Sequence, residues 1–67
     1  MLKYATKAEY IRAIQELHRR ARRSGWKLGT VHRNQIASWL GVSTSVLVAH
    51  NQAYDISVAD IQSGQVS

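Results

Sequence analysis

The sequence predicts a compact all-α domain of three helices, followed by a short C-terminal helix or strand. Apolar residues recur at helical spacing in the first third of the chain, and a glycine and a serine near its middle mark a tight turn between two shorter helices. The 67 residues include no proline, which would interrupt a helix. Residues 1–62 are expected to form one domain, and residues 63–67 a frayed tail.

The first helix is predicted over residues 7–24. Thr6 suits the N-cap, and Glu9, three positions later, can bond back to the amide of Thr6 as in a capping box. The residues expected to face the core are Ile11, Ile14, Leu17 and Ala21. Gly25 can adopt the left-handed conformation that commonly ends a helix.

A connector follows, in which Trp26 and Leu28 are expected to close the open end of the core. Either Thr30 or His32 can cap the second helix, which is predicted to end at Leu40.

The third helix is predicted to begin after Ser43 and to continue to about Ala53. Gly41 can take the left-handed conformation needed for a tight turn. The hydroxyl of Ser43 can then accept a hydrogen bond from a free amide at the start of the third helix.

The segment after residue 53 allows two interpretations. Tyr54, Ile56 and Val58 alternate with polar residues, as in a short strand. Ser57 and Asp60, however, have the spacing that caps a helix. We favour the helix.

Charge is distributed unevenly along the chain. All nine Lys and Arg residues lie within residues 3–33, which carry a net charge of +7, whereas residues 34–67 carry −2. A basic region of this kind is typical of a protein that binds a polyanion.

Several classes of site are not expected. The chain has no cysteine, and its three histidines are too scattered to form a recognisable metal motif. The sequence contains no carboxylate pair, nucleophile–base arrangement or glycine-rich phosphate loop, so we expect no enzymatic activity, cofactor or small-molecule ligand. Without a membrane-length apolar run or a signal peptide, the expected location is cytoplasmic. The small core favours support from a second copy, as a homodimer.

Residues 33–53 combine these features in a specific pattern. Ala37 lies four positions before Gly41 and Leu47 six positions after it, with apolar residues at Ile36, Leu40 and Val42. This segment resembles the helix-turn-helix of Cro and repressor-type phage regulators. The resemblance implies a sequence-specific regulator of transcription that binds double-stranded DNA, a repressor of phage or mobile-element type. The sequence departs from the family pattern at His50, where the family usually has an apolar residue.

If Leu47 faces inward, a set of short side chains on the third helix faces outward. The expected base-reading residues are Thr44, Ser45, Val48 and Ala49. Arg33 matches the family position that contacts the DNA backbone. The other expected phosphate contacts are Asn34, Gln35, Ser43, Asn51, Gln52, Arg19, Arg20, Arg22, Arg23 and Lys27.

Three other functions remain open: a recombination directionality or accessory factor that binds DNA, an RNA-binding protein using the arginine-rich first helix, and a protein that docks on RNA polymerase or another host factor. Trp39 is expected to pack against the C-terminal segment or to form a dimer contact. His50 is expected to be packed or hydrogen-bonded rather than a ligand.

Overall fold

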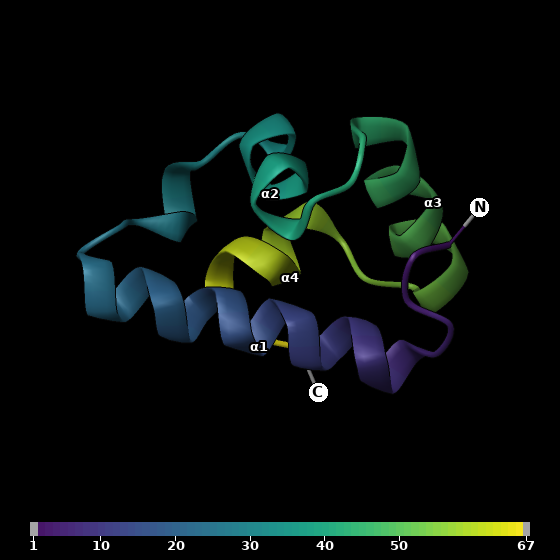
Figure 1. The fold of residues 1–67 in the computed structure, drawn as a ribbon, viewed down its shortest axis with the longest axis horizontal. Helices are drawn as coiled ribbons and strands as arrows, with labels where there is room; N and C mark the ends of the chain where they lie inside the picture. Colours follow the sequence, from purple (N-terminus) through teal and green to yellow (C-terminus); the bar gives the residue numbers. More distant parts are fainter. Residues whose placement is uncertain (1, 67) are drawn as a thin grey trace.

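The computed structural model describes residues 2–66 and is all-α. The order of its elements is α1 (Lys7–Ser24), a 3-10 turn η1 (Leu28–Thr30), α2 (Arg33–Leu40), α3 (Thr44–Tyr54) and α4 (Val58–Ser63). Figure 1 shows α1 along one edge of the molecule, α2 and α3 on the other side, and α4 between them. None of the helices in the described part is long and apolar enough to cross a membrane.

The predicted limits of the first helix are confirmed. The Thr6 side chain accepts a hydrogen bond from the Glu9 amide at 3.2 Å, and the Glu9 carboxylate accepts one from the Ala5 amide at 3.0 Å. The carboxylate therefore reaches back one residue beyond the expected partner. Gly25 ends α1 in the left-handed conformation, with φ 76°.

The C-terminal segment is a helix and not a strand. Ser57 and Asp60 form a reciprocal capping box, with bonds of 3.0 and 3.3 Å between each side chain and the other residue's amide. These two bonds satisfy amides that would otherwise be unpaired at the start of α4.

Residues 63–66, expected to form a frayed tail, have defined contacts in the structure. Ser63 is still helical, and Gly64 turns the chain with φ 77° while its amide bonds to the carbonyls of Asp60 and Ile61. Val66, only 8% exposed, packs into the core. A left-handed glycine followed by an apolar contact is a common way to end a helix, and this contact holds the chain after α4. Ser67 lies outside the described residues.

The core collects apolar side chains from every helix. Its buried members are Tyr10, Ile14, Leu17, Ala21, Leu28, Ile36, Ala37, Leu40, Leu47, Ile56, Ile61 and Val66. Ile11, expected in this core, is only partly buried at its edge. As predicted, Leu28 is buried and Trp26 packs against the core from the connector.

Trp39 stacks on Trp26. The two indole rings are nearly parallel, with their centroids 4.6 Å apart and 6° between their planes. The guanidinium of Arg20 lies over the Trp26 ring, 5.7 Å from its centroid. The stacking partner of Trp39 thus comes from the connector, where the sequence suggested the C-terminal segment.

Tyrosine and histidine rings pack together where the N-terminal segment contacts α3. His50 is 1% exposed, and its Nε2 accepts a hydrogen bond from the Tyr4 amide at 3.0 Å. Its Nδ1 lies 2.7 Å from the Val46 carbonyl, which can only accept, so Nδ1 carries the proton. The Tyr54 hydroxyl donates to the Tyr4 carbonyl at 2.6 Å. The expectation that His50 is packed and hydrogen-bonded is confirmed.

Tyr10 lies in the same cluster and donates its hydroxyl proton to the Asn51 side-chain oxygen. Its ring centroid lies 5.0 Å from that of His50. Burial raises the pKa of the Tyr10 phenol to about 12, and the neighbouring Tyr4 adds to the shift.

This shift predicts a loss of stability in alkaline solution. The unfolded chain releases the Tyr10 proton near the ordinary pKa of about 10, before the folded chain does. The phenol's contribution is therefore fully present below pH 10 and is lost as the pH rises through 12. Urea unfolding across this window should show a steeper fall in stability for the wild type than for Tyr10→Phe, and equal slopes would contradict the assignment.

Candidate nucleic-acid interface

Helices α2 and α3 are joined by the tight turn expected from the sequence. Gly41 has φ 75°, and its amide bonds to the carbonyls of Ala37 and Ser38. The Ser43 hydroxyl then accepts from the Val46 amide at 3.3 Å and so caps α3. His32, one of the two expected caps of α2, accepts from the Asn34 amide at 3.1 Å through Nδ1.

Lys3 covers this turn from the N-terminal segment. Its ammonium group donates to the Leu40 carbonyl at 2.8 Å, at the end of α2. A Cβ added to Gly41 would lie 3.2 Å from the same nitrogen. The close approach of Lys3 and the positive φ therefore both favour glycine at position 41.

The face of α3 opposite the core is the predicted base-reading surface. Leu47 and His50 are buried, whereas Ser45 is exposed and Thr44, Val48 and Ala49 are partly exposed. These four side chains are short and carry two hydroxyls and two apolar groups. This chemistry suits base edges and thymine methyl groups in a major groove.

A hydrogen bond links the first turns of the two helices. The Thr44 hydroxyl donates to the Asn34 side-chain oxygen at 2.8 Å. This bond uses the only proton of the Thr44 hydroxyl, so its oxygen can take part in another hydrogen bond only as an acceptor. The side-chain N–H groups of Asn34 are not used in this bond and can still donate. The pair thus offers an acceptor on α3 beside a donor on α2.

Arg33 lies beside the same face. This first residue of α2 is exposed, and it lines a shallow groove together with Val48 and Gln52 of α3. Asp55 lines the groove as well, after the last residue of α3. Because its negative charge repels phosphate, phosphate binding is favoured towards the N-terminal part of α3. Gln35 is also exposed on α2.

Two of the expected phosphate contacts already have structural roles. The Ser43 hydroxyl caps α3, and the Asn51 side-chain oxygen accepts the Tyr10 proton. Asn51 immediately follows the buried His50 and lies four positions after Leu47, so its side chain is drawn towards α1. Asn51 is nevertheless partly exposed and lines the groove beside Arg33 and Val48, so its amide protons remain available to a phosphate. The Ser43 hydroxyl also lies 3.1 Å from that of Ser45.

The arginines of α1 lie elsewhere. In Figure 1 the first turns of α2 and α3 are at the upper edge of the molecule, and α1 runs along the lower edge. Arg19 and Arg23 lie within 2.6 and 4.0 Å of Glu16, and Arg20 lies over Trp26. The structure thus brings Arg33 and Asn34 to the α3 surface but places Arg19, Arg20, Arg22 and Arg23 on a separate element, with Lys27 just after it.

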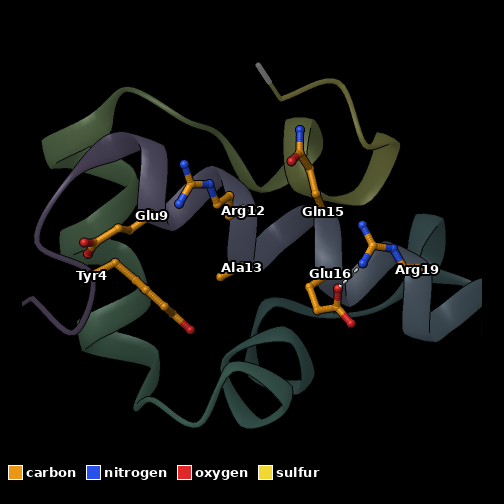
Figure 2. A pocket seen from close by; sticks show the side chains of 7 residues that line it. All are labelled: Tyr4, Glu9, Arg12, Ala13, Gln15, Glu16 and Arg19. Atoms are coloured by element: carbon orange, nitrogen blue, oxygen red, sulfur yellow. Dashed lines mark hydrogen bonds and ion pairs between the residues drawn. The ribbon is translucent and has the colours of Figure 1, made fainter.

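An open hollow on α1 is shown in Figure 2, where Arg12, Gln15, Glu16 and Arg19 project along the outer side of the helix. Its two carboxylates are engaged, because Glu9 accepts from the Ala5 amide and Glu16 pairs with Arg19. The hollow presents a mixed charged surface. In residues 2–66, no group of three or more His, Asp or Glu side chains lies together as a metal site would require.

The sequence did not predict the residues that hold α2 and α3 in place from the side opposite the proposed interface. They are Lys3, Tyr4, Tyr10 and Tyr54, which join the N-terminal segment and α1 to the two central helices. The histidine at position 50, where the family usually has an apolar residue, was the available signal, since a buried imidazole requires hydrogen-bond partners.

The chain was also compared with known proteins. No protein-family model, curated protein or solved structure matches it.

Proposed function

We propose that this protein binds double-stranded DNA in a sequence-specific manner, with the exposed face of α3 in the major groove. The observation that carries the proposal is the joint geometry at the start of α2 and α3. Thr44 and Ser45 face outward there, with Asn34 bonded to Thr44 and Arg33 beside Val48. A helix entering the groove with its first turn foremost would present these groups to base edges and phosphates.

Charge and helix polarity support this orientation. Both helices direct their first turns to the same edge of the molecule (Figure 1), where free amide groups favour anions. The protein carries a net charge of +5, which favours association with DNA at any sequence. As α3 contains neither Lys nor Arg, its specificity would come from hydroxyl and methyl contacts rather than from arginine–guanine pairs.

The role in the cell follows from the resemblance alone. Under this proposal the protein is a regulator of transcription of the repressor type, acting as a homodimer on two half-sites about 10 base pairs apart. Sedimentation equilibrium with and without a selected duplex tests the dimer, and one protomer per symmetric site would contradict it.

Selection from a pool of random duplexes tests the function. We expect the protein to enrich one sequence, and Thr44→Ala/Ser45→Ala to lose about 1–3 kcal/mol of discrimination per lost base contact. Affinity for unrelated duplexes should remain, because phosphate contacts are untouched. The control is Ala53→Ser, at an exposed position in the last turn of α3, one turn beyond the proposed base-reading residues. Equal discrimination by the double variant and the wild type would reject α3 as the base-reading element.

Arg33→Gln should weaken binding to all duplexes to a similar extent. The slope of log affinity against log salt concentration should flatten by about one unit, as expected for the loss of one phosphate contact. Lys7→Gln removes an equal charge from the exposed start of α1 and serves as the control. If Arg33→Gln leaves the slope unchanged, Arg33 does not contact phosphate.

A further inference from the structure

The C-terminal end of α1 carries a concentrated positive charge. We call the following residues the α1 basic surface: Arg19, Arg20, Arg22, Arg23 and Lys27. All five are exposed. Within residues 2–66 the only acidic side chain paired with any of them is Glu16, and the side chains of Arg19 and Arg23 remain 63% and 72% exposed beside it. A net positive charge therefore remains on the α1 basic surface after this pairing.

Helix stability accounts for only part of this charge. Arg22 and Arg23 lie in the last turn of α1, where positive charge is favourable next to the free carbonyl groups. Arg19 and Arg20 lie before that turn, and Lys27 lies beyond the helix. Arg19 pairs with Glu16 and Arg20 lies over Trp26, yet all three side chains remain exposed.

A duplex on α3 would not reach the α1 basic surface. The first turns of α2 and α3 lie at one edge of the domain and α1 at the opposite edge, along the direction in which the domain extends 22 Å (Figure 1). DNA is stiff over such lengths, and bending a site of 20–30 base pairs by 40–90° costs on the order of 1–6 kcal/mol. A straight duplex seated on α3 would leave the α1 basic surface open.

Resting on the proposed function for the first duplex, we propose that the α1 basic surface binds the phosphates of a second DNA segment. One domain would then bridge two duplexes, with α3 reading the first and arginines holding the second through its backbone. Arginine forks match phosphate oxygens well. The aromatic rings at this end are already engaged, Trp26 with Trp39 and Arg20, which favours backbone contacts over the base stacking of a single strand.

Energy transfer between two differently labelled copies of the selected duplex tests bridging. The test variant is Arg19→Gln/Arg22→Gln/Arg23→Gln, which keeps Arg20 because it packs on Trp26. We expect the wild type to bring the two duplexes together and the triple variant to lose the signal completely. The control Lys7→Gln/Arg12→Gln, which removes charge from α1 outside the α1 basic surface, should retain it.

A second measurement separates failure of bridging from failure of the proposed function. Affinity of the triple variant for a single short duplex, and its salt slope, should match those of the wild type. If both fall, the arginines bind the first duplex, and the bridging proposal is overturned. Absence of energy transfer with the wild type, bridging retained by the triple variant, or preference of the α1 basic surface for single-stranded RNA over duplex would also overturn it. By contrast, failure of Thr44→Ala/Ser45→Ala to change discrimination rejects only the role of α3.

Discussion

Replacement of Leu47 by alanine is expected to lower the free energy of unfolding by about 2–5 kcal/mol, the range for buried leucines. Leu47 is 0% exposed and belongs to the core cluster shared by all the helices. A core in a domain this small rarely supplies more than about 3–5 kcal/mol. Leu47→Ala should therefore leave a large fraction of the chain unfolded at room temperature, as measured by urea titration of the helical circular dichroism signal.

Gln52→Ala is the matched control for this effect. Gln52 is exposed on the same helix, and alanine is at least as favourable as glutamine in a helix. Its stability should stay within about 0.5 kcal/mol of the wild type, as is usual for surface substitutions. A fully stable Leu47→Ala variant would mean that α3 is rotated about its axis relative to the structure described above.

Replacement of His50 by alanine is expected to lower the free energy of unfolding by roughly 2–4 kcal/mol. The change leaves the half-buried Tyr4 amide without its acceptor, which costs up to about 1–3 kcal/mol, and adds a cavity among the surrounding rings. Thermal unfolding measures the total effect. Hydrogen exchange at the Tyr4 amide shows whether the N-terminal segment is released.

His50→Leu separates the two contributions. Leucine fills much of the imidazole volume but cannot accept the Tyr4 amide proton. We expect it to recover the cavity part of the loss while the Tyr4 amide still exchanges faster than in the wild type. Slow exchange of that amide in His50→Leu would contradict the proposed role of the imidazole in holding the N-terminal segment.

Local signals predicted most of the fold. The limits of α1 follow from Thr6 and Gly25, and those of the turn before α3 from Gly41 and Ser43, because caps act within one helical turn. After residue 53, the pair Ser57 and Asp60 favoured a helix over a strand, and their capping bonds also join residues only three positions apart.

Contacts between distant parts of the chain were harder to predict. The stacking of Trp26 on Trp39 depends on the path of the η1 connector, and the packing of Val66 depends on the turn at Gly64. The pairing of Tyr4 with His50 joins positions 46 residues apart. No spacing rule identifies such partners, because the tertiary arrangement decides which side chains meet.

The candidate site shows the same division. The outward face of α3 could be predicted from helical periodicity once Leu47 was placed in the core. The separation of the α1 arginines from the α3 face could not be predicted, because it depends on how α1 packs across the domain from the first turns of α2 and α3. The hydrogen bond that occupies the Asn51 side-chain oxygen likewise depends on Tyr10 from another helix.

The most direct test of the central claim is a map of backbone amide resonances on addition of one equivalent of the selected duplex. We predict the largest shifts in residues 33–35 and 43–49, at the starts of α2 and α3, with small shifts in the first half of α1. Shifts confined to residues 12–27, with α3 unchanged, would contradict the claim that α3 enters the major groove.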